Sequence, residues 1–438
     1  MSPRLGAAVA RTFSSLRSSR NFRLYLSGQF VSAVGTWMTF TATSWLVLRL
    51  THSGTALGVN AALAFGPVLL LGPWGGVLAD RFDKRRILTW TQTSFAVVSI
   101  SLATLVFTDV ITLWIVYSLS LTAGVITAID NPARQSFYVE MVGEQTLTNA
   151  VSLNSAAFTG ARIIGPAVAG LLIAFVGMAI CFLIDGISYM AVLAALLAMR
   201  VDELHAQRRS TRERGHLVAG LRYVWATDDL RRPLLIMAVI FTFVFQWQVL
   251  VPLLAVRTFS AGAREFGLLS AAAGLGSFIG AISMANRNAE PTFERLAMFM
   301  SGVGLAMAAV AFAPALPVAM LLMVPVGFAA MSFMITGNTM LQLAARPEAR
   351  GRVMALYGVV FLGSTPIGAP IVGLLGEHLG PRVDFLLAGS LAMGMGAGVL
   401  VLARRARSRA LSGVAAPAIE HDRPAGVAEA EMPLPASG

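Results

Sequence analysis

Hydrophobic residues gather in twelve runs of about 20 residues, separated by short polar stretches. A helix that rises about 1.5 Å per residue needs roughly 20 apolar residues to cross ~30 Å of hydrocarbon. The pattern therefore predicts an all-α membrane protein. The twelve predicted transmembrane helices cover residues 24–48, 55–79, 87–108, 111–130, 150–175, 178–199, 233–256, 264–286, 294–313, 316–342, 353–376 and 383–403.

The composition supports this class. Hydrophobic residues make up 56% of the chain and charged residues only 13%, whereas about a quarter of the residues in soluble domains are charged. The formal net charge of +11 does not indicate nucleic-acid binding, because the basic residues lie near the predicted helix ends. The single cysteine, Cys181, excludes a disulfide framework and a thiolate metal site.

Most of the 33 basic residues fall on one side of the predicted membrane when successive loops are assigned to alternate sides. Basic loops remain in the cytoplasm, so the bias predicts that both termini are cytoplasmic. The N-terminal stretch has arginines but no short apolar core with a cleavage site, and we therefore predict no cleaved signal peptide. The last residues are rich in Ala, Pro, Gly and Glu and are predicted to be disordered.

The fifth and eleventh predicted helices are similar in sequence. At a constant offset of 203 residues, Asn149 to Gly177 aligns without gaps on Arg352 to Gly380, with glycine at several matched positions. The chain is therefore predicted to consist of two six-helix halves, an arrangement found in secondary transporters. The predicted parts are a cytoplasmic tail at 1–20, a bundle at 21–199, a linker with an interfacial helix at 200–232, a second bundle at 233–404 and a disordered tail at 405–438.

The most distinctive polar segment is GGVLADRFDKRR, from Gly75 to Arg86, between the second and third predicted helices. It concentrates charged residues in a short turn between two membrane-spanning segments. Two hypotheses account for it. The turn is either a conformational latch held by specific partners or a charged segment that only fixes the topology.

The same segment resembles the motif that major facilitator superfamily transporters carry between helices 2 and 3. The matching residues are Gly76, Asp80, Arg81, Lys84, Arg85 and Arg86, and Asp83 stands where the family has glycine. The segments DNPARQSF, GARIIGPAVAGLL and RGRVMALY are similar to those of the enterobactin-exporter and macrolide-efflux branch of drug:proton antiporters, of the transmembrane secretion effector type. This resemblance implies two pseudo-symmetric bundles in the bacterial inner membrane and a monomer.

The resemblance also assigns a role to the charged turn. In the superfamily the matching acid lies at the N-terminal end of helix 11, so we expect Asp80 near Arg352. A nearby basic residue pairs with an acid at the end of helix 4, so we expect Lys84 or Arg85 to pair with Asp130. Such contacts contribute ~0.3–2 kcal/mol each, enough to bias two conformations of similar free energy. We call the expected contact of Asp80 with helix 11 the latch.

Glycine and proline recur along the fifth and eleventh predicted helices. Small residues let helix backbones approach closely, and proline removes a hydrogen bond from the helix. We expect close contacts there between helices, which serve either conformational change or packing alone. The residues are Gly160, Gly165, Pro166 and Gly170 in the fifth helix and Gly363, Pro366, Gly368, Pro370 and Gly373 in the eleventh.

Arg162 and Asp185 are charged residues inside predicted membrane helices, where charge is costly. Their depths in the membrane differ by ~5–8 Å, a span that an arginine side chain covers. We therefore predict an ion pair between them. Its role is either to stabilise the first half or to act as a proton-sensitive switch.

The superfamily resemblance places the substrate cavity among helices 1, 4, 7 and 10. Helix 1 has polar residues at three- and four-residue spacing, and two amides flank a tryptophan in helix 7. Such walls suit an apolar or amphipathic ligand. Packing between helices is the alternative role for each residue. The predicted set is Gln29, Ser32, Thr36, Thr39, Gln246, Trp247, Gln248 and Asn338.

The sequence contains no motif for ATP hydrolysis or for metal binding. The sequence has no phosphate-binding loop of the G-x-x-x-x-G-K-[ST] type, and its five histidines lack metal-site spacing. We expect no enzymatic activity, cofactor, metal or nucleic-acid partner. The predicted function is export of a drug-, macrolide- or siderophore-like molecule by proton antiport, with membrane lipid as the surroundings. The alternatives are an uncoupled facilitator and a non-transporting receptor or assembly factor on the same scaffold.

Overall fold

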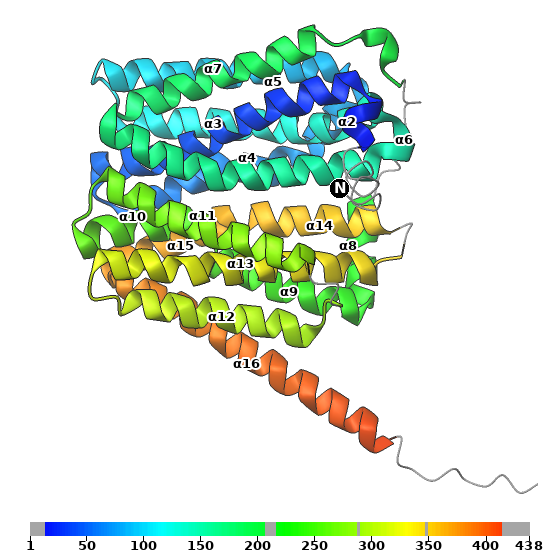
Figure 1. Ribbon diagram of the computed structural model, residues 1–438, viewed down its shortest axis with the longest axis vertical. Coiled ribbons are helices and arrows are strands. Elements are labelled where there is room, and N and C mark those ends of the chain that lie inside the picture. The colour runs from blue at the N-terminus through cyan, green and yellow to red at the C-terminus, as the bar shows by residue number, and fades with distance from the viewer. Residues whose placement is uncertain (1–13, 206–215, 287–289, 347–348, 414–438) are drawn as a thin grey trace, which may run out of the picture.

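The computed structural model describes residues 14–205, 216–286, 290–346 and 349–413. Twelve helices in this described part are long and apolar enough to cross a membrane, which confirms the predicted all-α membrane fold. Figure 1 shows them lying side by side, with the first six in an upper bundle and the last six in a lower one.

The first half contains a short helix, α2, and six membrane-spanning segments in five further elements. Two of the segments, Leu113–Gly143 and Gln145–Phe175, form one continuous element that bends at Gly143, whose φ of 71° is left-handed. Glycine adopts this conformation without the penalty that a side chain brings. The elements are α2 Ser14–Ser18, α3 Arg20–Thr51, α4 Gly54–Arg81, α5 Lys84–Phe107, α6 Leu113–Phe175 and α7 Met178–Leu197.

The second half is more interrupted. Its first span consists of α9, α10 and η2, and its fifth consists of α14 and α15. The linker contains η1 Val201–Glu203 and α8 His216–Ala226. The remaining elements are α9 Asp228–Phe243, α10 Trp247–Leu253, η2 Leu254–Thr258, α11 Ala263–Asn286, α12 Phe293–Ala311, α13 Leu316–Ala344, α14 Arg350–Gly363, α15 Thr365–His378 and α16 Pro381–Gly413.

Polar side chains fix where several helices begin. Ser53 accepts a hydrogen bond from the backbone N–H of Ala56 at the start of α4, and Asp83 accepts one from Arg86 at the start of α5. Each satisfies a donor that the helix itself leaves without a partner. Asp83, which replaces the glycine of the family motif, thus ends the turn between α4 and α5 by capping the second helix.

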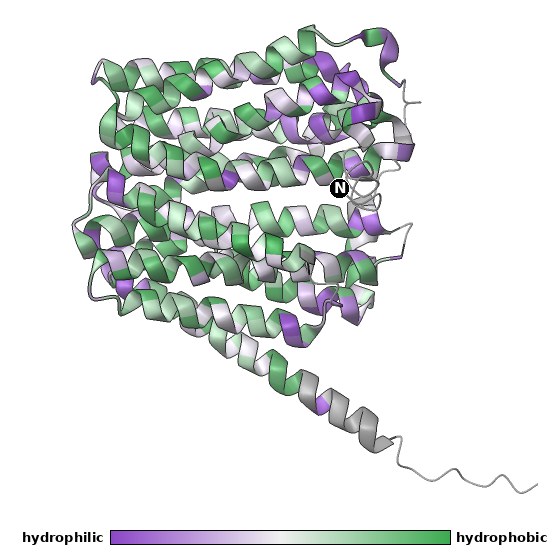
Figure 2. Cartoon of the chain, viewed as in Figure 1, coloured by the Kyte–Doolittle hydropathy of each residue, from purple (hydrophilic) through white to green (hydrophobic). Residues whose placement is uncertain are grey.

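The two ends of the bundle are both polar, and each carries different elements. We call the end that carries α2, the turn at 81–84 and α8 the inner end, and the opposite end, with the turn at 51–54, the outer end. Figure 1 places α2 and α8 together on the right. Figure 2 shows hydrophilic residues at both ends and hydrophobic residues along the helices between them, as a membrane-spanning bundle requires.

The repeat identified in the sequence has a structural counterpart. A Cβ atom on Gly165 in α6 would press on α3, and one on the aligned Gly368 in α15 would press on α9. These helices are the first of each half. Gly170, five residues further along, approaches Gly267 of the second half, and the aligned Gly373 approaches Gly54 of the first. Each copy therefore carries one glycine for its own half and one for the opposite half.

Two predictions at the edges of the bundles need refinement. The predicted interfacial helix in the linker corresponds to α8, with Val224 buried in the core and Leu221 and Trp225 about half exposed, at 48% and 54%. At the C-terminus, α16 continues to Gly413, into the stretch predicted as a disordered tail. The remaining tail residues, 414–438, lie outside the described part of the chain, as do residues 1–13 of the N-terminal tail.

Candidate functional site

At the outer end, a carboxylate of the second half caps a helix of the first. The Oε2 atom of Glu377, near the end of α15, accepts hydrogen bonds from Ser53 Oγ at 2.6 Å and from the backbone N of Thr55 at 2.8 Å. These donors belong to the first turn of α4, where the partial positive charge of a helix N-terminus favours an anion. We call this contact between Glu377 and α4 the outer gate.

Arg257 strengthens the connection. One guanidinium nitrogen donates to the backbone oxygen of Glu377 at 2.8 Å, and another donates to that of His52 at 2.7 Å. Nearby, the rings of Trp45 and Phe266, from opposite halves, stack at a centroid distance of 5.5 Å. The two halves are thus joined at the outer end by hydrogen bonds and by aromatic packing.

Sequence reasoning missed Glu377 and Arg257. The signal for Glu377 was present in the repeat, because the aligned position in the first half is Ala174. This acid occurs in only one copy of the repeat, and it therefore marks a place where the two halves differ. Its partner on α4 could not be inferred in the same way, since that contact depends on how the halves pack.

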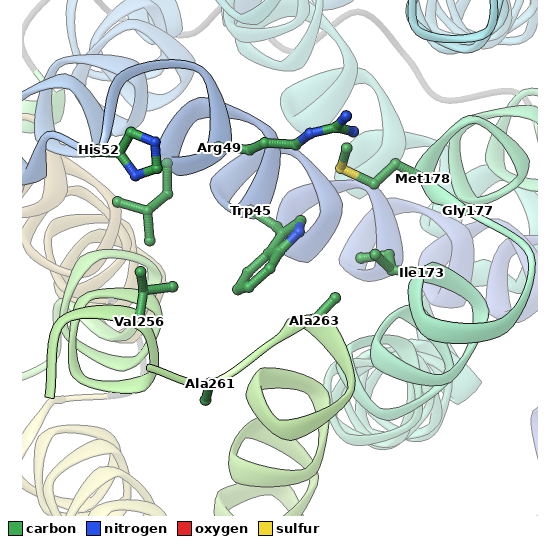
Figure 3. A pocket seen from close by; sticks show the side chains of 10 residues that line it. Trp45, Arg49, His52, Ile173, Gly177, Met178, Val256, Ala261 and Ala263 are labelled. Carbon is green, nitrogen blue, oxygen red and sulfur yellow. The ribbon is translucent and has the colours of Figure 1, made fainter. Parts of the chain in front are cut away.

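A cavity of about 450 Å³ lies beside the outer gate, between α3 and α11. Figure 3 shows Trp45 projecting into it, with Arg49 and His52 on one side and Ala261 and Ala263 on the other. Its wall combines an aromatic face with basic groups. The cavity was not predicted, and its lining is Trp45, Leu48, Arg49, His52, Ile173, Gly177, Met178, Val256, Ala261 and Ala263.

At the inner end, the predicted pairing of the charged turn is wrong. Lys84 forms an ion pair with Glu140 at 2.7 Å, and Arg85 donates from Nε to the backbone oxygen of Leu196 at 2.7 Å. Asp130, the expected partner, is instead buried and paired with Arg134. Lys84 therefore contacts the end of helix 4 through a different acid, whereas Arg85 contacts α7.

The reason is the length of helix 4. Its apolar run ends near Asp130, but the helix itself continues to Gly143. Glu140 therefore lies ten positions closer to the inner end than Asp130 and meets the turn. Asp130 lies deeper, where Thr91 Oγ1 and Gln92 Nε2 also donate to it, at 2.6 Å and 3.0 Å.

The other members of the motif lie around the last turns of α4. Asp80 and Gly76 are half-buried, whereas Arg81 is exposed. The facing helix, α14, begins at Arg350, close to the position expected from the sequence. The contact between Asp80 and the start of α14 stays a prediction. Along its length, α4 packs far more extensively against α15 than against α14.

The predicted ion pair between Arg162 and Asp185 is not formed. Asp185 is buried and accepts a hydrogen bond from Ser99 Oγ at 2.7 Å, and a Cβ atom on Gly35 would lie 2.6 Å from its Oδ1. The Arg162 guanidinium instead lies over the Trp37 ring, 5.2 Å from its centroid. The sequence placed both residues at similar depths, but Arg162 meets Trp37 on α3 and Asp185 meets Ser99 on α5.

The polar stripe of helix 1 faces the interior of the first half. Gln29 and Ser32 are buried, and Thr39 is half-buried. The Thr36 hydroxyl lies 3.1 Å from that of Tyr189 on α7. These contacts favour the packing role of the stripe, and its exposure to substrate stays a prediction.

In the second half, the predicted cavity residues differ in how deeply they are buried. Gln246 is fully buried and its Nε2 donates to the backbone oxygens of Phe241 and Thr242, so it supports the break between α9 and α10. Trp247 and Gln248 are half-buried. Asn338, also half-buried, accepts a hydrogen bond from Gln342 and interacts with Tyr357 on α14.

The described residues contain no cluster of three or more His, Cys, Asp or Glu side chains that could hold a metal ion. The site described above instead consists of contacts between the two helical halves. Residues 10–423 match a protein family described as transmembrane secretion effectors. The chain belongs to this family. It is a transporter of the major facilitator superfamily and not an enzyme.

Three transporters are similar in sequence to this chain. The multidrug efflux pump Tap of Mycolicibacterium fortuitum is 27% identical over 83% of this chain and 91% of its own length. An enterobactin exporter, EntS, of Shigella boydii serotype 18 is 26% identical over 89% of this chain and 92% of its own. The staphyloferrin A transporter of Staphylococcus aureus is 25% identical over 59% of this chain and 65% of its own length.

Solved structures support the fold of this transmembrane secretion effector. A bacterial homologue of the human lysosomal transporter Spinster, in an inward-facing and occupied conformation, matches with a TM-score of 0.69 over 88% of this chain and 98% of its own. The nucleoside transporter NupG matches with a TM-score of 0.68 over 87% of this chain and 98% of its own. At 15% and 11% identity, respectively, these likenesses show the major facilitator fold alone.

Proposed function

We propose that this chain exports a small amphipathic or apolar molecule by alternating access. The observation that carries the proposal is the outer gate, in which Glu377 of one half caps a helix of the other. In a transporter that works by alternating access, the two halves separate at the outer end. Hydrogen bonds placed there can hold that end closed in one conformation and break in the other. Relatives named as a multidrug efflux pump and as exporters of siderophores support an exporter of small molecules.

The direction follows from the charge distribution. Basic residues gather at the inner end, which favours a cytoplasmic location for that end and for both termini. With the outer gate closed and α4 packed more extensively on α15 than on α14, the substrate enters from the cytoplasm in this conformation. The substrate leaves after the gate opens. The latch between Asp80 and α14 then holds the inner end closed.

We assign proton coupling to Asp185. This carboxyl is buried within the first half and takes its donor, Ser99, from a neighbouring helix. An ionised carboxylate inside a membrane is costly without a charged partner, and Asp185 has none among the residues that the structure describes. Gain or loss of a proton there changes the contacts of α7 with α3 and α5.

The proposal is tested in proteoliposomes with an imposed pH gradient and a pH-sensitive dye inside. A macrolide, a catecholate siderophore and a neutral drug are added in turn, and substrate-dependent proton flux is the expected result. Asp185→Asn should abolish the proton flux while substrate exchange continues. Asp384→Asn, which changes another buried carboxyl, is the matched control and should retain the flux.

The alternative functions give different outcomes in the same vesicles. Substrate exchange without proton movement would identify an uncoupled facilitator. Neither exchange nor proton flux for any compound would contradict the transport proposal and favour a receptor or assembly role. We expect the transporter to act as a monomer, which its mass in detergent solution tests.

A further inference from the structure

Midway along a membrane span of the first half lies a basic side chain that has no acidic partner among the described residues. Arg162 lies in the middle of the span Gln145–Phe175 and is half-buried. Among the residues that the structure describes, no carboxylate forms an ion pair with it. Because a guanidinium is always charged, it requires some other compensation at this depth.

Part of that compensation comes from aromatic rings. The guanidinium lies over Trp37 of α3 and interacts electrostatically with Tyr357 of α14, which belongs to the opposite half. Asn338 of α13 interacts with the same tyrosine. A cation between an electron-rich ring and neutral polar groups retains hydrogen-bond donors for a further acceptor.

The surroundings of this group are aromatic on both sides. In the first half, Trp37 packs against Phe40 and Phe158, at centroid distances of 5.6 Å and 5.7 Å. In the second half, Tyr357 stacks on Phe361 at 6.2 Å. The site thus offers flat apolar surfaces and one fixed positive charge, supplied by both halves of the transporter.

From this geometry we propose that Arg162 binds an anionic group of the exported molecule. The substrate class is an aromatic or amphipathic acid, whose rings pack against Trp37 and Tyr357. This inference rests on the proposed export function and specifies its cargo. Because its residues come from both halves, a bound anion is released when the halves rearrange around it. Arg162 is therefore a specificity-determining residue.

The test uses two dyes with the same xanthene ring system and opposite charge, fluorescein and rhodamine 123. Their binding to the purified full-length protein is measured by fluorescence anisotropy in an uncharged detergent. We expect wild type to prefer fluorescein. Hydrogen bonds to a charged group are strong, so Arg162→Gln should weaken fluorescein binding by about 10- to 100-fold and leave rhodamine 123 binding unchanged or tighter. Arg162→Lys should retain an intermediate preference for the anion.

The matched control is Arg264→Gln. Arg264 also lies over an aromatic ring, Phe175, but at the outer end, and its loss should not change the preference between the dyes. The proposal is overturned if Arg162→Gln weakens both dyes equally, if wild type prefers rhodamine 123, or if fluorescein fails to bind at millimolar concentration. A single sharp elution peak for each variant excludes misfolding as the cause.

Failure of this inference and failure of the export function have different signatures. Charge-dependent binding without transport into or out of vesicles would contradict only the export function. Export of rhodamine 123 that does not depend on Arg162 would contradict only the assignment of an anionic cargo. Both measurements use the same purified protein.

Discussion

The two ends of the helix pair formed by α4 and the α14–α15 span use the same chemistry in opposite directions. At the outer end, Glu377 of the second half caps the N-terminus of α4. At the inner end, Asp80 of α4 is expected to meet the N-terminus of α14. The outer contact is formed, and the inner one is the predicted latch. In the proposed transport cycle, one such contact is exchanged for the other.

The described contacts at the two ends are of different kinds. The outer gate has two hydrogen bonds to the carboxylate and further support from Arg257. At the inner end, Lys84 and Arg85 contact partners within their own half. The charged turn is thus held to the first bundle by these two contacts.

The largest effect is expected from Glu377→Ala. The loss of hydrogen bonds to a charged group costs ~1.5–3 kcal/mol, which shifts the ratio of open to closed outer gates by about 10- to 100-fold. Spin labels at Val110→Cys and Phe312→Cys, both exposed near the outer end, should report a longer distance in a Cys181→Ala background. Glu265→Ala is the control, because this acid accepts its hydrogen bond from Gly262 within its own half. An unchanged distance in Glu377→Ala would disprove the gate.

Gly373→Ala should have a smaller effect in the same direction. The added Cβ would overlap the backbone of Gly54, and overpacking of this kind costs ~1–3 kcal/mol when the neighbours cannot move. Separation of the halves relieves the overlap, so the outer distance should increase. Gly394→Ala, where no atom lies within 4 Å of the added Cβ, is the matched control. Equal behaviour of the two variants would show that the close approach has no influence on the gate.

Asp80→Asn tests the inner end. A contact between a carboxylate and a helix N-terminus contributes ~0.3–2 kcal/mol, so transport should fall several-fold while membrane insertion is unchanged. Asp83→Ala, three positions further along, removes the side-chain cap of α5 and should affect stability more than transport. Normal transport by Asp80→Asn would rule out the latch and leave the charged turn as a topology signal.

The smallest net change is expected from the double variant Asp80→Asn with Glu377→Gln. If the two carboxylates stabilise opposite conformations, their losses oppose one another, and the distance distribution should return towards that of wild type. Independent sites combine additively in free energy. A double variant that resembles either single variant would show that the two ends are not coupled through one equilibrium.

The sequence predicted the elements better than their contacts. Runs of apolar residues gave twelve helices, and the repeat identified the equivalent glycines Gly170 and Gly373, which both approach the opposite half. Hydropathy could not reveal that helix 4 extends past Asp130 to Glu140, because polar residues continue a helix once it leaves the apolar layer. Partners at that end were therefore assigned to the wrong acid.

Depth and direction are separate properties of a helical residue. The spacing of Arg162 and Asp185 gave similar depths, but the rotation of each helix decided that one contacts Trp37 and the other Ser99. Glu377 was missed for a related reason. Its partner lies in the opposite half, and packing between halves leaves no local pattern in the sequence.

The contact between Gly170 and Gly267 has a consequence for the entropy change that accompanies separation of the halves. Side chains that meet at an interface lose rotamer freedom, and they regain it when the interface separates. Two glycines have no rotamers to lose, so this part of the interface forms and parts without a side-chain entropy change. The temperature dependence of opening should then reflect the hydrogen bonds of Glu377 and Arg257 and the stacking of Trp45 on Phe266, rather than side-chain ordering at these glycines.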